Sequence, residues 1–149
     1  MKKLMNILLL FALILIFESC SFFQKFDPGY WKAKSEFKKE LEFVQKILDN
    51  PDKMQEIIEY SEYYDANNFE LCSDSYLRYI KYLKPDDNGC EADILGFNRT
   101  TSTDGKGKIL YENAKVVSVY KSGSYNRIVF VFFEEKDKII LGEICSVTI

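Results

Sequence analysis

The spacing of hydrophobic positions divides the chain into a first half that predicts helices and a second half that predicts strands. From about Tyr30 or Ser35 to Asp49, apolar residues recur three and four positions apart, as on one face of a helix. Asn50-Pro51-Asp52 ends this helix and begins a second one, with Asn50 as cap and Pro51 at the first position. The apolar positions of the two predicted helices are Phe37, Leu41, Val44, Ile47, Leu48, Met54, Ile57, Ile58 and Tyr64.

A third, short helix is predicted over residues 76–83, because Ser73-Asp74-Ser75 is a group of capping residues and Lys84-Pro85 stops the helix. Residues 94–97 predict a short strand. Residues 98–108 are rich in Thr, Ser, Asp and Gly and predict an exposed loop. Residues 115–121, 127–133 and 139–149 are typical of strands separated by short turns, so they predict an antiparallel meander.

The middle strand of this meander is apolar on both faces. Alternation directs two sets of side chains to opposite sides: Val129, Val131 and Phe133, against Ile128, Phe130 and Phe132. Both faces should therefore be covered. The three helices cover one, and curvature of the sheet, the loop at 98–108 or a second protomer would cover the other.

The predicted fold class is therefore α+β: an N-terminal helical hairpin and a short third helix packed on a C-terminal antiparallel β-meander. Helices followed by a curved antiparallel sheet resemble the NTF2-like and cystatin-like folds. That likeness is an analogy of element order, with no motif behind it.

The N-terminus has the pattern of an export signal. Lys2 and Lys3 precede the uncharged, almost wholly apolar residues 4–17. These fourteen residues are fewer than the about 20 that a membrane-spanning helix needs, which favours a secretory signal. Ser19-Cys20 follows, a small residue directly before a cysteine.

This arrangement resembles the lipobox of bacterial lipoproteins, although Glu18 departs from the small or apolar residue usual two positions before the cysteine. The resemblance implies a signal peptide at residues 1–19, a diacylglycerol on Cys20, a tether at residues 20–29 and a single domain at residues 30–149. The protein would then be anchored by lipid in the bacterial cell envelope, outside the inner membrane.

Two alternatives remain open at this terminus. An ordinary signal peptide cut after Ser21 would release a secreted or periplasmic soluble protein, since Ser19 and Ser21 occupy the two recognition positions. A short uncleaved anchor would keep residues 1–19 attached. All three place the remainder of the chain outside the inner membrane.

The amino-acid composition excludes several classes of partner and of catalytic or metal site. The net charge of −3 argues against a nucleic-acid partner, because such proteins carry an excess of Lys and Arg. The absence of His excludes Ser–His–Asp triads, Cys–His dyads and His-containing metal sites. No C-x-x-C spacing occurs either, so we predict no metal site, no cofactor and no enzymatic activity.

Three cysteines follow Cys20, and outside the inner membrane they favour a disulfide. Cys72 and Cys90 flank the third predicted helix and are the pair closest in sequence, so we predict that they are bridged. Cys145, in the last strand, would be the free thiol. The alternative is that all three cysteines are buried small hydrophobic residues.

Glu143 is the carboxylate of greatest interest, because it shares the strand phase of Leu141, Cys145 and Val147. In a straight strand it would point inward, where burial would raise its pKa and suit it to act as a general base in a pocket. Alternatively, Gly142 marks a bulge that turns Glu143 to solvent.

Tyrosines form a second candidate set. Tyr76, Tyr79 and Tyr82 recur at helical spacing on the third predicted helix, and a face of this kind would suit an envelope protein or a glycan. The alternative is that they line the core and its rim. The function that these patterns predict is a non-enzymatic binding module, attached to the membrane through its lipid. A ligand-pocket or enzyme-like domain with Glu143 inside is the alternative.

Overall fold

A computed structural model describes residues 28–72, 75–103 and 109–148. The chain divides into two compact units, Met1–Glu36 and Phe37–Ile149. In the first unit the structure describes helix α2 (Pro28–Glu36), in which the ring of Tyr30 meets the ring of Trp31 edge-on and the Lys34 ammonium lies over Trp31. The predicted signal peptide, Cys20 and most of the tether lie outside the described residues. Among the described helices, none combines the length and the apolar character needed to cross a membrane.

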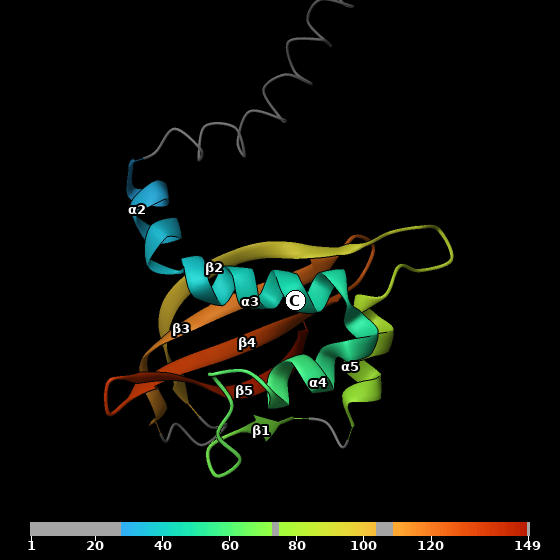
Figure 1. Cartoon of the computed structure of the whole chain (residues 1–149). Helices are drawn as coiled ribbons and strands as arrows, with labels where there is room; N and C mark the ends of the chain where they lie inside the picture. Colours follow the sequence, from blue (N-terminus) through green and yellow to red (C-terminus); the bar gives the residue numbers. More distant parts are fainter. Residues whose placement is uncertain (1–27, 73–74, 104–108, 149) are drawn as a thin grey trace, which may run out of the picture. The chain divides into compact units, whose positions relative to one another are not determined.

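The second unit is built on one five-stranded sheet with helices on one face (Figure 1), which confirms the α+β class. The strand order is β1-β5-β4-β3-β2; β1 pairs with β5 in parallel and all other pairs are antiparallel. The strands are β1 (Glu70–Leu71), β2 (Ala92–Thr103), β3 (Ile109–Lys121), β4 (Asn126–Glu135) and β5 (Lys138–Thr148). The predicted meander is therefore present as β3, β4 and β5. The finer analogy to NTF2-like and cystatin-like folds stays a prediction.

The helices of this unit begin and end close to where the sequence pattern places them. They are α3 (Lys38–Asp49), the 3₁₀ turn η1 (Pro51–Lys53), α4 (Met54–Glu59) and α5 (Tyr76–Leu83). Ser75 caps α5 as predicted, because its side chain accepts a hydrogen bond from the Leu77 amide at 3.1 Å. Asn50 makes no such cap; its side chain bonds weakly back to the Lys46 carbonyl instead.

Four predicted boundaries are wrong. Helix α4 ends at Glu59 rather than near Tyr64, and β3 begins at Ile109 rather than at residue 115. The other two concern the first helix and the predicted loop. The first helix does not continue through Phe37, because the Phe37 side chain is buried, with its ring centroid 5.2 Å from that of Phe97 on β2. Residues 98–103 are strand rather than loop, because they pair with the first half of β3. Threonine, which is frequent in this segment, has a high propensity for strands. Residues 104–108 of the predicted loop lie outside the described residues.

The helices cover one face of the sheet with a large apolar core. From the sheet, Val117, Val119, Phe130, Phe132 and Ile144 pack against the helical residues Phe43, Val44, Ile47, Ile58 and Tyr79. We call this the helix face. Within it lies a buried ion pair, since Lys115 Nζ is 2.9 Å from Glu40 Oε1 and only 1% of the Glu40 side chain is exposed. The apolar periodicity of α3 did not predict a carboxylate at this position.

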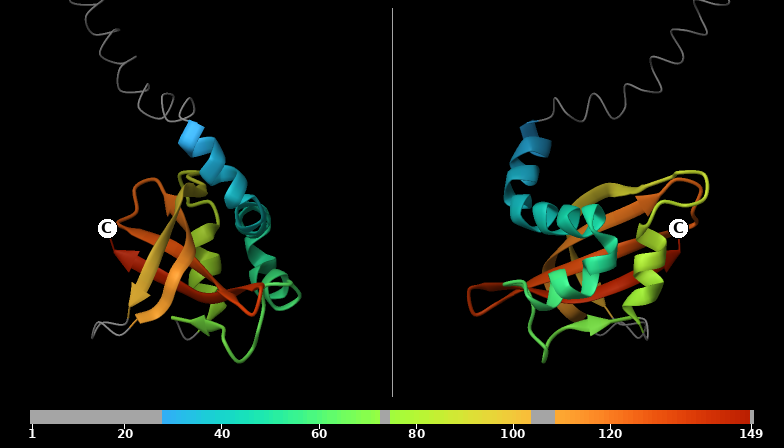
Figure 2. Two further views of the ribbon diagram at one scale, coloured as in Figure 1. Left: turned by 90° about the vertical axis from the view of Figure 1, so that its left-hand side faces the viewer. Right: turned by 45° about the vertical axis from the view of Figure 1, so that its right-hand side comes forward.

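The opposite side of the sheet, which we call the outer face, is covered by the sheet itself. β3 pairs with β4 only from Lys115 to Tyr120, while its earlier part stays paired with β2. The sheet curves, so that the linked ends of β2 and β3 lie on the side away from α3 and α4 (Figure 2). Tyr111 of this segment stacks on Phe133 of β4, with ring centroids 4.6 Å apart. Curvature, the first of the predicted covers, therefore shields the outer face.

Candidate functional site

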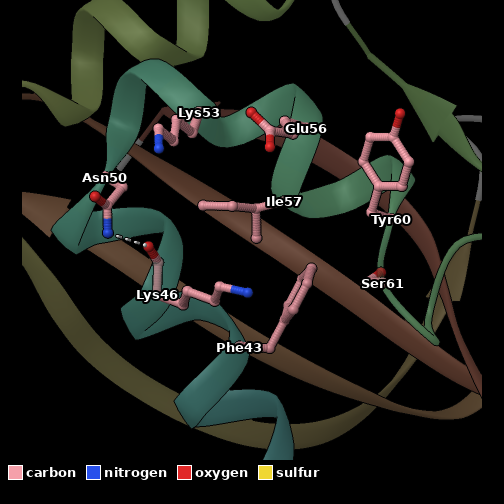
Figure 3. Close-up of a pocket in the computed structure, with 8 residues that line it drawn as sticks. All are labelled: Phe43, Lys46, Asn50, Lys53, Glu56, Ile57, Tyr60 and Ser61. Atoms are coloured by element: carbon pink, nitrogen blue, oxygen red, sulfur yellow. Dashed lines mark hydrogen bonds between the residues drawn. The ribbon is translucent and has the colours of Figure 1, made fainter.

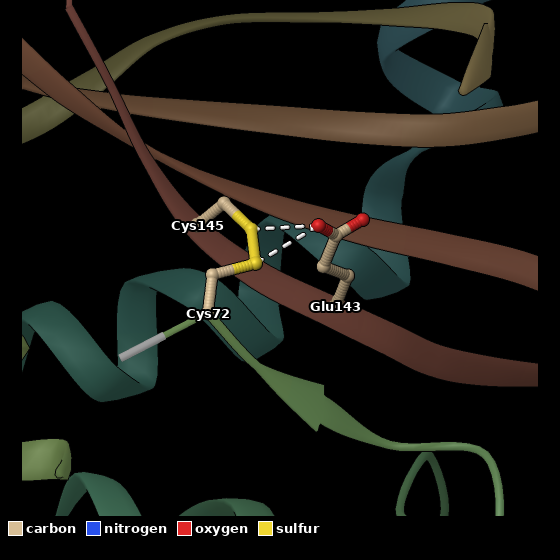
Figure 4. Close-up of side chains that lie close together, drawn as sticks. All are labelled: Cys72, Glu143 and Cys145. Carbon is tan, nitrogen blue, oxygen red and sulfur yellow. Dashed lines mark hydrogen bonds between the residues drawn. A yellow bond between two sulfur atoms is a disulfide. The ribbon is translucent and has the colours of Figure 1, made fainter. Parts of the chain in front are cut away.

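Two cysteines and a glutamate meet on the outer face, at the edge of the sheet formed by β1 and β5 (Figure 4). In the parallel register Glu70 lies beside Glu143 and Leu71 beside Ile144. The next residue, Cys72, donates its amide to the Ile144 carbonyl at 3.0 Å. Its Cα is 5.0 Å from that of Cys145, a separation typical of a disulfide, and the two are bonded.

The predicted Cys72–Cys90 bridge is therefore wrong, and Cys145 is not the free thiol. Cys90 is free and half-buried, and its amide donates to the Asp86 carboxylate in the turn after α5. Proximity in the sequence suggested the wrong partner, because β1 is only two residues long and has no alternating pattern to reveal it. Once β1 is paired with β5, the register itself places Cys72 next to Cys145.

A bulge decides where Glu143 lies. Val131 pairs with Glu143, but the next residue, Phe132, pairs with Leu141, so Gly142 is left without a partner. The bulge separates Glu143 from the phase of Leu141, which stays in the core. The prediction of an inward Glu143 in that phase is wrong, and the bulge expected at Gly142 is present. Glu143 is nevertheless half-buried rather than free in solvent, because the outer face is covered here.

The carboxyl group of Glu143 contacts both sulfur atoms. Its Oε1 lies 2.7 Å from Cys145 Sγ and 2.9 Å from Cys72 Sγ. Burial raises the pKa of Glu143, and the nearby Glu70 carboxylate raises it further. Burial also raises the pKa of Tyr111, with smaller contributions from Glu143 and Glu70. These groups form one site of restricted solvation around the disulfide. Cys72, Glu143 and Cys145 lie close together, but the two bonded sulfur atoms are not thiolates and so are not metal ligands in this state.

The tyrosines of α5 do not form a binding face, so that prediction is wrong and the alternative of a core and rim is correct. Tyr79 is 2% exposed and donates its hydroxyl to the Ile144 carbonyl at 3.0 Å. Tyr82 donates to the Asn126 carbonyl and accepts from the Lys121 amide. Burial raises the pKa of Tyr76 to about 12, with a further contribution from Glu59. The i, i+3 spacing marks the buried side of α5, where the hydroxyls of Tyr79 and Tyr82 bond to backbone groups.

An open groove lies on the helical side of the unit. It has a volume of about 330 Å³ and lies between α3 and α4 (Figure 3). Phe43 and Ile57 supply its apolar part, while Lys46 and Lys53 bring two ammonium groups. Tyr60, at the end of α4, borders it with 87% of its surface exposed. In the described part of the chain, neither lysine is in an ion pair.

Sequence reasoning missed this groove because its residues come from the two sides of the α3–α4 joint. The one available signal was Tyr60, an aromatic residue that is not on the apolar face predicted for the second helix. A second hollow, of about 270 Å³, is lined by residues that include Arg99, Asn113 and Lys115. Glu143 lines neither hollow, so the pocket in which it was expected is not at either place.

Comparisons with protein-family models, with curated proteins and with solved structures found no match to this chain.

Proposed function

We propose that the protein is a lipid-anchored binding module of the bacterial cell envelope, which docks an acidic segment of another envelope protein in the groove between α3 and α4. The observation that carries the proposal is the combination in this groove of an exposed aromatic ring with two lysines outside any described ion pair. Large aromatic residues with one polar end are the typical anchors of protein interfaces.

Charge favours an acidic partner. Lys46 and Lys53 outnumber the one carboxylate of the groove, Glu56, although the whole chain carries a net charge of −3. A local positive site on an acidic protein attracts anionic groups selectively, since the remaining surface repels them. The half-buried Ile57 and the Phe43 ring add an apolar surface, which suits a peptide side chain better than a sugar. We therefore favour a peptide segment over a glycan.

A photo-crosslinking amino acid tests this proposal in the intact envelope. It replaces Tyr60 in one full-length variant and Tyr125 in a matched control, since Tyr125 is similarly exposed, at 82%, and does not line the groove. We expect Tyr60, and not Tyr125, to crosslink to one discrete envelope protein that mass spectrometry can identify. The double charge reversal Lys46→Glu/Lys53→Glu should abolish that product.

Equal crosslinking at both positions, or a product that survives charge reversal, would contradict the proposal. A product that carries carbohydrate and no peptide would instead identify a glycan ligand and overturn the choice of a protein partner. Binding of the identified segment, measured by calorimetry, should also weaken as salt concentration rises.

The anchor requires a separate test. Cys20→Ser should move the protein from the membrane to the soluble fraction, because at least two acyl chains are needed to hold a protein stably at a bilayer. The mass of the N-terminal peptide of the wild-type protein distinguishes the alternatives. A diacylglycerol on Cys20 supports the proposal, whereas an unmodified terminus at residue 22 or an uncleaved Met1 contradicts it.

A further inference from the structure

We propose that the Cys72–Cys145 disulfide is an exchange-competent redox site, which accepts two electrons from an external dithiol, with Glu143 as the proton donor to the Cys145 sulfur. This activity is independent of the groove between α3 and α4 and goes beyond a binding role. It would also make the protein a carrier of oxidising equivalents for thiols outside the inner membrane.

The two sulfur atoms are not equally accessible. Cys72 is exposed and follows the short edge strand β1, while Cys145 is half-buried within β5. An attacking thiolate therefore reaches Cys72 Sγ, and Cys145 is the leaving sulfur. This asymmetry gives each cysteine a separate role, because the rate of exchange depends on which sulfur is attacked and how well the other leaves.

Glu143 is placed to assist the leaving sulfur. Its Oε1 is 2.7 Å from Cys145 Sγ and 2.9 Å from Cys72 Sγ. A disulfide sulfur carries no hydrogen, so these contacts favour a protonated carboxyl in the oxidised protein and S–H donors in the reduced protein. Burial on the outer face favours the protonated form of Glu143, and the neighbouring Glu70 carboxylate favours it further. A neutral acid that touches the sulfur where negative charge develops is in position for general acid catalysis.

The reaction balances as follows. One thiolate of the dithiol attacks Cys72 Sγ, the Cys72–Cys145 bond breaks, and its electron pair goes to Cys145 Sγ. That sulfur takes the proton of the Glu143 carboxyl. The second thiolate of the dithiol then attacks the dithiol sulfur that is bonded to Cys72 in the mixed disulfide. This step releases the Cys72 thiolate. Water then supplies a proton to Cys72 and another to the Glu143 carboxylate. The dithiol is oxidised to a disulfide, and two cysteine thiols are formed.

The test measures reduction of the full-length protein in detergent by dithiothreitol. A Cys20→Ser/Cys90→Ser background leaves Cys72 and Cys145 as the only thiols among the four cysteines. Peptide mapping first establishes the bridge; two free thiols in this background under oxidising conditions would overturn the proposal. Alkylation of the free thiols and mass spectrometry then give the rate at which the disulfide is reduced. At each pH this rate is divided by the fraction of dithiothreitol present as thiolate, which gives the corrected rate.

In the Cys20→Ser/Cys90→Ser background with Glu143 intact, we expect this corrected rate to fall as rising pH deprotonates Glu143. Glu143→Gln should lower it at least about tenfold at mildly acidic pH and remove its pH dependence. The matched control Glu91→Gln, at an exposed carboxylate outside the site, should keep both the rate and the profile. If Glu143 has a purely structural role, the pH profile of Glu143→Gln will keep the shape of the unsubstituted profile, and the proposal is overturned. An unaltered rate in Glu143→Gln would also overturn it.

Discussion

The two faces of the sheet are buried by different means, and the difference sets how far polar groups on each face are shielded from water. On the helix face, three helices bury a large cluster that includes Phe130, Phe132 and Ile144. On the outer face, the buried cluster consists of Ala114, Val116 and Val131, with Tyr111 and Val129 packed at its edge. A thin cover leaves polar groups half-buried rather than excluded, and this is where Glu143 and the disulfide lie. The helix face therefore holds most of the buried apolar core, and the outer face holds the redox site that we propose.

Substitutions at two adjacent residues of β4 give the most direct comparison of how much each face contributes to stability. Phe130, fully buried on the helix face, and Val131, 5% exposed on the outer face, lie next to each other in the chain. Phe130→Ala should lower the free energy of unfolding by about 3–5 kcal/mol. Val131→Ala removes less apolar volume and should cost about 2 kcal/mol. Denaturant unfolding measures both; a neutral Val131→Ala would show that the outer face contributes no core.

The buried ion pair tests whether the helix face tolerates charge only when it is compensated. Lys115→Met should cost about 3–5 kcal/mol, because it leaves the Glu40 carboxylate buried without its counter-ion. One oxygen of that carboxylate, Oε2, already has no hydrogen-bond partner among the described residues. The double variant Glu40→Leu/Lys115→Met should recover most of the loss, since it removes both charges. A double variant no more stable than Lys115→Met would contradict this account of Glu40.

Gly142 tests how tightly the outer face is closed. A Cβ at this position would lie 2.8 Å from the Phe133 ring and 2.9 Å from the Tyr111 ring, so Gly142→Ala must displace the stacked pair. We expect a cost of about 1–3 kcal/mol, as for other overpacked sites. Gly96→Ala is the matched control, because a Cβ there meets nothing within 4 Å. Equal thermal melts for the two variants would show that the rings yield freely and that the cover is loose.

The smallest expected effect is the pH dependence due to Glu143. Because the pKa of the native carboxyl is raised above its ordinary value of 4.5, the native state binds more protons than the unfolded state between these two pKa values. Stability should therefore fall as pH rises through this window and stay level above it. Glu143→Gln lacks this term, so its melting temperature relative to wild type should increase from pH 4.5 toward neutrality. A constant difference across the window would contradict a raised pKa.

Most of the fold was predictable because its main signals are local. The third helix was predicted at its observed bounds, after a capping group that includes Ser75, and the alternation in β4 assigned Phe130 and Val131 to opposite buried faces. The errors arose where a distant contact overrides local preference. The burial of Phe37 against Phe97 interrupts a helix, and pairing with β3 extends β2 into a segment with the composition of a loop.

The candidate site was predictable only in part. Glu143 stood out in the sequence, and Gly142 was a correct sign of the bulge. Its neighbours were not foreseen, because the pairing of Cys72 with Cys145 depends on a two-residue parallel strand that leaves no periodic signal. The tyrosines of α5 show the opposite case. Their spacing was read correctly as one helix face, but only packing determines whether such a face meets solvent or the sheet.

The sequence by itself therefore determined the α+β class, the order of helices and strands and the need to cover both sides of β4, because these follow from hydrophobic periodicity within single segments. The tertiary structure alone decided the disulfide partner, the face on which Glu143 lies, the burial of Glu40 and the groove beside Tyr60. Each of these depends on register or packing between segments far apart in the chain. A one-residue bulge reverses the direction of a side chain, and no local pattern determines the length of chain that a sheet will pair.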